Sequence, residues 1–394
     1  MGIKIDWPAR GHEYTKSEID AVTQVLFNKK AALTQGDKVL KFEEKFAKYI
    51  GVKNAFSLMS AAHGLDIAAK LIEIKPGDEV IIPAHTYCAS ALAFTRRGAV
   101  IRWADINIDT LTVSIESIKS LVNEKTRAIV VVHLYGLICP EINEIKEYAK
   151  NKKLYLIEDC AQSLGSKLNN KHCGTFGDIA CYSFHAQKNL TTLGEGGMIV
   201  VADNEKAKKV AGLRINGHAP FENKKEYWLP AMVNVDQDIE GIWPIKSTMN
   251  EAQAAIGLLV LDRIDDLTRK RRERGLMIRK ELESFEEIKF QEIYSEESHS
   301  HHLLPALCKS ENWHRDDLIR ILFNKYGIKS IIQYYPLNRY DLFNKSGNAN
   351  ANIPVTDMFF DNMISFPFSL VIEDVDFLYM INSIKSSIKT LNNR

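Results

Sequence analysis

Three stretches near the middle of the chain decide its fold: KLYLIED (153–159), GDIACYSF (177–184) and GGMIVVA (196–202). Each is a short and nearly continuous apolar run, which is typical of strands that are buried on both faces. The first run ends in two acids, and a loop that carries a lysine, HAQKNLTTLGE, separates the other two. Because α/β sheets bind ligands at the carboxyl ends of their strands, we expect the chemistry of the chain at these ends.

Working outward from this centre, apolar strand patterns alternate with helical ones. Strands are expected near 53–59, 78–83, 99–105 and 127–135, and helices near 15–30, 37–50, 88–97 and 141–152. Strands that alternate with helices predict an α/β fold whose sheet is mostly parallel and covered by helices on both faces.

The pattern changes after about residue 203. Residues 249–284 predict one long helix or two joined helices, and the Asn-rich stretch 344–354 is expected to be a surface loop. Further strands are expected at 288–293, 301–308 and 328–336, with helices near 314–325 and 372–390. We therefore expect two domains: a large one over 1–260, with an N-terminal helical segment, and a smaller C-terminal α/β domain over 261–394.

Composition excludes some classes of function. The net charge of +1 gives no electrostatic case for binding nucleic acid or an anionic membrane. The basic run RKRRER (269–274) follows DRIDD and is expected to be a solvated helix face. The six cysteines form no C-x-x-C pair, so we expect reduced thiols and no metal ion. The N-terminus lacks a signal-peptide core and no apolar run could span a bilayer, so a cytoplasmic protein is expected.

Asp159 and Lys188 are the main candidates for chemistry. Asp159 either caps a helix or aims a carboxylate into a cleft, where it would keep the ring nitrogen of a flat cofactor protonated. Lys188 is either an exposed lysine or one that lies near the sheet, where burial and a nearby cation would lower its pKa and make the amine nucleophilic. The glycines of Gly194 to Gly197 would permit close approach of the backbone.

Three weaker candidates also lie at strand ends. Ser183 ends one strand, and Ser60, Ala61 and Ala62 lie between a strand and a helix. A helix N-terminus with small residues offers backbone N–H groups to a phosphate, although plain helix capping gives the same pattern. Tyr87 either stacks on a flat ring or belongs to the core.

Taken together, these segments resemble the DegT/StrS group of sugar aminotransferases, which are pyridoxal-phosphate (PLP) enzymes with the aspartate-aminotransferase-like fold type I. The resemblance covers nearly the whole chain. Its blocks are Gly36–Glu43 (G-x-x-V-x-x-F-E), Pro76–Pro83, Val131–Gly136, Glu158–Gln162, Ser183–Gly197, Gln253–Leu258 and Ile364–Phe368.

The resemblance assigns roles around the cofactor. It implies that Lys188 holds PLP as a Schiff base, that Asp159 contacts the pyridine nitrogen and that Gln162 lies near the phenolic oxygen. Tyr87 takes the stacking position and Ser183 that of a phosphate ligand.

The resemblance also shows departures from the family pattern. The family's Ser-Gly-Thr phosphate loop reads Ser60-Ala61-Ala62, so the threonine hydroxyl is missing while the N–H groups of Ala61 and Ala62 remain. Lys246 stands where the family has an asparagine that reaches the phosphate of a neighbouring subunit. The resemblance points less specifically to the sugar, for which His185, Tyr334 and Tyr335 are the candidates.

The implied activity is transfer of an amino group from glutamate or glutamine to a keto-sugar, expected to be nucleotide-linked, in amino-sugar or surface-polysaccharide biosynthesis. A homodimer with shared active sites is expected. Alternatives are a cyclitol aminotransferase, a PLP-dependent sugar dehydratase and a non-catalytic binding module with this fold. Lys188 favours amine transfer, because relatives that dehydrate sugars have histidine at this position.

Overall fold

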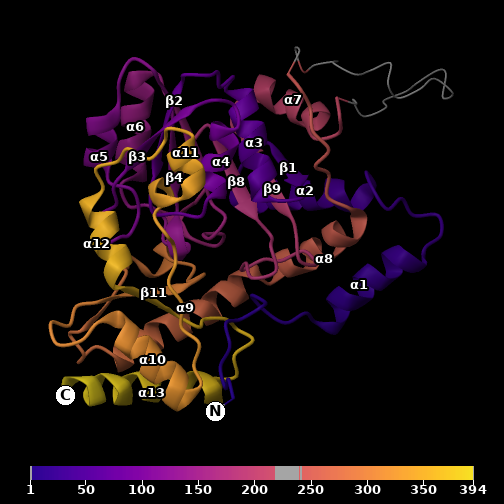
Figure 1. Ribbon diagram of the computed structural model, residues 1–394. Coiled ribbons are helices and arrows are strands. Elements are labelled where there is room, and N and C mark those ends of the chain that lie inside the picture. The colour runs from indigo at the N-terminus through magenta and orange to yellow at the C-terminus, as the bar shows by residue number, and fades with distance from the viewer. Residues whose placement is uncertain (1, 218–238, 240–241, 394) are drawn as a thin grey trace, which may run out of the picture.

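The computed structural model describes residues 2–217, 239 and 242–393 and is built around a seven-stranded sheet (Figure 1). In spatial order, its strands are β1 (Ala55–Leu58), β9 (Gly197–Val201), β8 (Ile179–Ser183), β5 (Tyr155–Asp159), β4 (Thr126–Val132), β2 (Glu79–Pro83) and β3 (Val100–Ala104). The five strands from β8 to β3 pair in parallel, while β9 pairs antiparallel with both β8 and β1. The α/β fold with a mostly parallel sheet is therefore confirmed.

The sheet is buried on both faces. Successive residues of β4 alternate between two core clusters: Val130 and Val132 belong to one, and Ile129 and Val131 to the other. This is the two-residue period of a strand, and it explains why the strands read as continuous apolar runs in the sequence. The helices of this part are α1 (Lys16–Phe27), α2 (Asp37–Ile50), α3 (Ala61–Leu71), α4 (Ala89–Thr95), α5 (Ile115–Leu121), α6 (Ile142–Lys152), α7 (Asn204–Leu213) and α8 (Glu251–Asp262).

The C-terminal part has its own sheet and core. Its three strands, β10 (Ile288–Phe290), β11 (Leu304–Cys308) and β12 (Met363–Phe366), pair antiparallel. The main helices are α9 (Ile264–Glu281), α10 (Arg315–Tyr326) and α13 (Asp374–Asn392), and Figure 1 shows α10 and α13 on the opposite side of the molecule from α3 and α6. The expected division at 260/261 falls just before the joint between α8 and α9, and it stays a prediction.

Short elements complete the chain. They are the hairpin β6 (Lys167–Leu168) and β7 (Lys171–His172), the helices α11 (Asp341–Lys345) and α12 (Pro354–Asn362), and the 3-10 turns η1 (Leu134–Gly136), η3 (Glu296–Ser298) and η4 (Leu337–Arg339). Within the described part of the chain, no helix combines the length and the apolar character needed to cross a bilayer.

One local expectation is wrong and two are confirmed only in part. Residues 328–336 form no strand beyond isolated bridges at Ile328 and Ile331, and the third strand of the small sheet is β12 instead. The Asn-rich stretch is not only a surface loop, because Asn348 is buried and its Oδ1 accepts a hydrogen bond from the Ile101 N–H at 2.7 Å. In the basic run, Arg271 is only 1% exposed, so the run is not simply a solvated face.

Candidate active site

A cavity of about 430 Å³ lies at the carboxyl ends of β5 and β8 and at the first turn of α3. A volume of this size suits a small organic ligand. The structure brings nine of the candidate residues together in its wall: Ala61, Ala62, Tyr87, Asp159, Gln162, Ser183, His185, Lys188 and Tyr334.

Asp159 is the last residue of β5 and is 5% exposed. Its Oδ2 accepts a hydrogen bond of 2.7 Å from the Ser90 hydroxyl, and its Oδ1 accepts one of 3.1 Å from the Ala161 N–H. No helix begins here, since turn residues follow. The helix-cap interpretation of Asp159 therefore fails, and the carboxylate lines the cavity in a fixed orientation.

The neighbouring acid, Glu158, has a structural role. Its two oxygens accept three backbone N–H groups, from Gly174, Phe176 and Gly177, at 2.6–2.7 Å. The ring of His133 completes the set, with Nε2 at 2.9 Å from Oε2. Adjacent side chains of a strand point to opposite faces, so one acid of the pair organises a loop while the other faces the cavity.

Glu158, His133 and Cys160 are also close enough together to resemble a metal site. However, the carboxylate already accepts the hydrogen bonds just described, and His133 Nδ1 accepts one from the Cys139 N–H at 3.0 Å. Both residues therefore have filled hydrogen-bonding roles, and we assign no metal to them.

Lys188 reaches the same cavity from the loop after β8. Burial lowers the pKa of its amine to about 8, and the Asp159 carboxylate opposes this by raising the pKa. The expected neighbouring cation is not the cause of the shift. An amine with this pKa is substantially neutral near pH 8 and can act as a nucleophile and as a base.

His302 was not predicted from the sequence. Its Nε2 lies 3.4 Å from Lys188 Nζ, and burial holds the pKa of its ring well below the usual value. The only sequence signal for this residue is a His-His pair before the apolar run of β11. Ser90, the partner of Asp159, was also missed.

Gln162 and Tyr334 form the wall beside Asp159. The Gln162 side chain accepts a hydrogen bond of 2.7 Å from the Tyr135 N–H and donates one of 2.9 Å to the Tyr334 hydroxyl. The rings of Tyr135 and Tyr334 stack at a centroid distance of 6.1 Å. Since the Tyr334 oxygen accepts from Gln162, its own proton is available for a ligand.

The other end of the cavity is a helix N-terminus. Ser60 caps α3 by accepting the His63 N–H, which leaves the N–H groups of Ala61 and Ala62 without intrahelical partners. A Cβ on Gly197 would lie 2.4 Å from the Ser60 carbonyl carbon, so only glycine lets β9 approach the cap this closely. The small residues therefore serve a site suited to an anion.

Two candidates lie outside this wall. Lys246 is exposed and pairs through its backbone with Ile215, away from the cavity of its own chain. Tyr335 packs edge-on against Tyr340 and Phe360. At the mouth, Tyr87 is 58% exposed, with its ring edge-on to that of Tyr334.

The donor set fits the expected cofactor. PLP carries a phosphate, a basic ring nitrogen and an aldehyde, and the cavity offers a helix N-terminus, a buried carboxylate and an amine of lowered pKa. Ala61, Ala62 and Ser183 would hold the phosphate, Asp159 the ring nitrogen and Lys188 the aldehyde carbon.

Comparison with known proteins points the same way. The sequence model of the DegT/DnrJ/EryC1/StrS aminotransferase family matches residues 12–385. GDP-perosamine synthase of Vibrio cholerae is 30% identical over 338 residues, which cover 85% of this chain and 86% of that protein. The dTDP-3-amino-3,6-dideoxy-alpha-D-galactopyranose transaminase of Aneurinibacillus thermoaerophilus is also 30% identical, over 337 residues with the same coverage.

Solved structures agree with the sequence comparisons. The sugar aminotransferase Spr1654 from Streptococcus pneumoniae in its pyridoxamine-phosphate form superposes with a TM-score of 0.88 at 25% identity, covering 98% of this chain and all of that one. The PLP form of the same protein superposes with a TM-score of 0.83 at 26% identity, covering 98% and 99%.

Proposed function

This chain belongs to the DegT/DnrJ/EryC1/StrS aminotransferase family and is a PLP-dependent aminotransferase, and from that premise we propose that it transfers an amino group from glutamate or glutamine to a nucleotide-linked keto-sugar. Action on a sugar is supported by the relatives, whose names are those of sugar aminotransferases. The product would be an amino sugar of the kind used in surface polysaccharides.

One observation carries the chemical part of the proposal: Asp159 and Lys188 face the same cavity, and burial lowers the pKa of the lysine to about 8. When bound, PLP supplies the electron sink that makes the α-proton of an amine acidic. Asp159 keeps a proton on the ring nitrogen, because an opposite charge favours the charged form. The freed Lys188 amine takes up and returns the α-proton.

The nucleotide-linked substrate is proposed from the relatives and from the mouth of the cavity. The two curated relatives have GDP and dTDP sugars in their names, so the nucleotide varies among similar chains. Tyr87 offers an exposed ring at the mouth, and Tyr334 and His185 offer polar atoms within the wall. We propose that the sugar lies between these three side chains and that the nucleotide extends outward.

We further propose that two chains share their active sites. Lys246 is exposed and lies outside the cavity of its own chain, so it can serve a cofactor phosphate only in a second copy. A lysine ammonium can supply charge to a phosphate where an asparagine amide would supply a hydrogen bond.

The experiment is to incubate the purified protein with PLP, an amino donor and a panel of keto-sugars, free and linked to GDP, dTDP or UDP, and to identify aminated products by mass spectrometry. We expect amination of a nucleotide-linked sugar, and complete loss of activity in Lys188→Ala. Lys345→Ala is the control, because Lys345 is exposed and is not among the residues that line the cavity.

Other results would contradict the proposal. Amination of a cyclitol, or loss of water from a sugar without amine transfer, would identify one of the alternative activities. A Lys188→Ala variant that still transfers the amino group would remove the basis of the proposal.

A further inference from the structure

Arg271 is a fully buried arginine whose hydrogen bonds go to backbone carbonyl groups. It lies in α9 and is 1% exposed. Its Nη2 donates to the Gly11 carbonyl at 2.7 Å, and its Nη1 donates to those of His301 and His302 at 3.1 and 3.4 Å. Among the described residues no carboxylate pairs with it. A buried guanidinium without an acid is costly, which suggests that what it holds in place matters.

The first group held by Arg271 belongs to the N-terminal segment that lies on the lysine loop. The Gly11 N–H donates to the Ala186 carbonyl at 2.9 Å, and Gln187 Nε2 donates to the Pro8 carbonyl at 2.8 Å. A Cβ on Gly11 would lie 2.0 Å from the Lys188 carbonyl oxygen. The backbone of Lys188 is therefore in direct contact with Gly11, and no larger residue fits there without movement.

The second group held by Arg271 is the backbone of His302, whose ring faces the amine of Lys188. The Nδ1 atom of this ring is buried and has no partner among the described residues. Buried N–H groups without a partner are rarer than acceptors without one, so the proton belongs on Nε2. In this tautomer, His302 donates to the lone pair of a neutral Lys188 amine.

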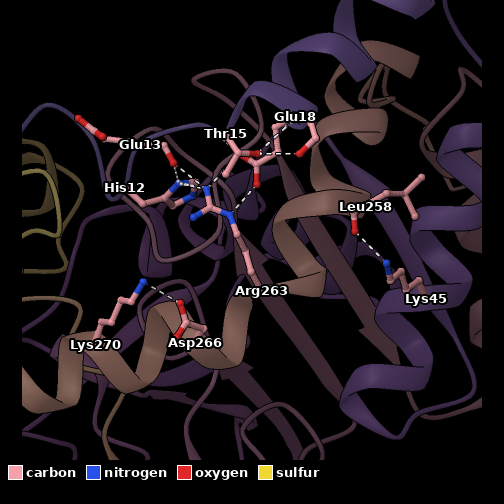
Figure 2. A network of polar contacts seen from close by, with 10 residues as sticks. His12, Glu13, Thr15, Glu18, Lys45, Leu258, Arg263, Asp266 and Lys270 are labelled. Atoms are coloured by element: carbon pink, nitrogen blue, oxygen red, sulfur yellow. Dashed lines mark hydrogen bonds and ion pairs between the residues drawn. The ribbon is translucent and has the colours of Figure 1, made fainter.

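The N-terminal segment is fixed on both sides of Gly11. The Ser369 hydroxyl donates to the carbonyls of Arg10 and Gly11 at 2.6 and 3.1 Å. Beyond Gly11, Arg263 donates to the Glu13 carbonyl at 2.6 Å and to both oxygens of Glu18, as Figure 2 shows. The segment therefore cannot slide along the lysine loop without breaking several hydrogen bonds, of which that between Ser369 and the Gly11 carbonyl is buried.

We propose that Arg271 and Gly11 are positioning residues that hold Lys188 between two supports, the N-terminal segment against its backbone and the His302 ring against its amine. This inference rests on the proposed role of Lys188 as the lysine that holds the cofactor. The addition to that role is that the Arg271 guanidinium, on helix α9, fixes both supports and thereby the position of the lysine.

The consequence is that loosening either support changes the lysine itself. Apart from His302, the titratable side chains in the wall of the cavity that holds the Lys188 amine are Asp159, whose charge raises the pKa, and Tyr87, His185, Glu195 and Tyr334. Burial dominates over the charge of Asp159. If a support is lost and water reaches the amine, the pKa of Lys188 must rise toward its ordinary value.

The test measures the pKa of Lys188 directly in the full-length chain freed of cofactor. Lysine is labelled with an amine reagent across pH 6–11, and the labelling of the Lys188 peptide is followed by mass spectrometry. The wild-type midpoint is expected near 8. Arg271→Lys keeps the charge but cannot make all three hydrogen bonds of the guanidinium to backbone carbonyls. Gly11→Ala changes no charge at all. Both are expected to raise the midpoint by about one unit.

Histidine variants test the second support. His302→Leu is expected to raise the midpoint by about one unit, while His302→Gln, whose amide can donate from the same position, is expected to restore part of the shift. A fall in the midpoint in His302→Leu would mean that Nε2 of the ring accepts a hydrogen bond from a charged lysine, which contradicts the proposed tautomer.

Matched controls separate positioning from general damage. Arg272 lies next in the same helix and also donates to backbone carbonyls, those of Gly165, Glu297 and His299. Gly177→Ala would also place a Cβ against a backbone carbonyl oxygen, that of Leu156 at 2.6 Å. Arg272→Met and Gly177→Ala are expected to lower the melting temperature without moving the Lys188 midpoint.

The inference is overturned if folded Arg271→Lys and Gly11→Ala leave the midpoint unchanged, or if the control variants move it equally. Because labelling needs neither cofactor nor sugar, this result is independent of the proposed activity. An enzyme that failed to aminate any sugar could still show the shift, and an active aminotransferase could fail to show it.

Discussion

At the scale of single residues, the site depends on neighbours that differ in role. Asp159 faces the cavity with its orientation fixed by Ser90, while Glu158 is saturated by three backbone N–H groups and His133. The same residue type at adjacent positions thus serves chemistry in one case and loop structure in the other. Substitutions at the two positions should therefore fail in different ways.

For Asp159→Asn we expect a folded protein that still binds PLP but has a kcat/KM lower by about a thousandfold, because the ring nitrogen loses its charged partner. For Glu158→Gln we expect a loss of about 3 kcal/mol in unfolding free energy, because buried N–H donors lose a charged acceptor. Steady-state kinetics and urea unfolding measure the two effects. Equal loss of stability in both variants would contradict this division.

Ser90→Ala isolates the orientation of the carboxylate. It removes one hydrogen bond to a charged acceptor, which is worth about 1.5–3 kcal/mol. We expect kcat to fall by about tenfold while the charge of Asp159, and hence PLP binding, is retained. A variant with unchanged kcat would show that the Ala161 N–H alone is sufficient to orient Asp159.

Lys188 also makes stability depend on pH. Its pKa is lowered to about 8 in the folded chain, whereas an unfolded lysine titrates near 10.4. Between these values the unfolded chain binds the extra proton, so the unfolding free energy of the cofactor-free protein should rise with pH by about 1.4 kcal/mol per unit. Below pH 8 the lysine is protonated in both the folded and the unfolded chain, so it no longer makes the unfolding free energy change with pH. There the folded chain bears the full cost of the buried charge.

The measurement is chemical unfolding of wild type and Lys188→Met at several values between pH 7 and 10.5. The difference between the two proteins isolates this lysine from other titrating groups. Parallel curves for the two proteins would contradict the lowered pKa.

At the scale of elements, Glu251 of α8 caps the N-terminus of α2. The two oxygens of Glu251 accept the N–H groups of Gly36, Lys38 and Val39, which are donors at the N-terminus of α2. A Cβ on Gly36 would lie 2.7 Å from this carboxylate, which explains the glycine that opens the first family block.

Glu251→Ala should therefore destabilise the protein by about 2 kcal/mol, since it removes a charged cap from three backbone N–H donors, of which that of Val39 is buried. Glu44→Ala, an exposed position on α2, should change stability by less than about 0.5 kcal/mol. Thermal unfolding of both variants is the measurement. Equal effects would mean that the cap is not specific.

The sequence predicted most elements of the large sheet because each one has a local signal. Apolar runs locate its strands, and residues at their ends locate Asp159 and Lys188. The errors occur where distant residues decide. Residues 328–336 read as a strand, yet Tyr334 is drawn to the cavity by Gln162, some 170 positions away. The sequence around His302 and Arg271 does not reveal their roles, because these come from contacts with Lys188 and Gly11.

At the scale of the whole molecule, we expect a dimer in which each cavity needs both chains. Lys188→Ala and Lys246→Ala should each be inactive or nearly so, the first through the cofactor lysine and the second through the phosphate. If the two proteins are unfolded and refolded together, random pairing yields heterodimers with one intact site, which restores about a quarter of wild-type activity.

The control is Lys188→Ala unfolded and refolded by itself. Size exclusion gives the oligomeric state. Failure to regain activity, or a fully active monomer, would mean that Lys246 does not serve a second chain.

The contact between Asn348 and Ile101 has a consequence for how the chain is made. β3 is the last strand of the large sheet, and one of its outward backbone N–H groups is covered by a side chain that follows nearly 250 residues later. Trp103 makes a second contact there, through its indole N–H, to the Asn348 carbonyl. During synthesis, this border of the sheet stays open to pairing with another nascent chain until the C-terminal third emerges. Protection against aggregation is therefore among the last features the protein acquires.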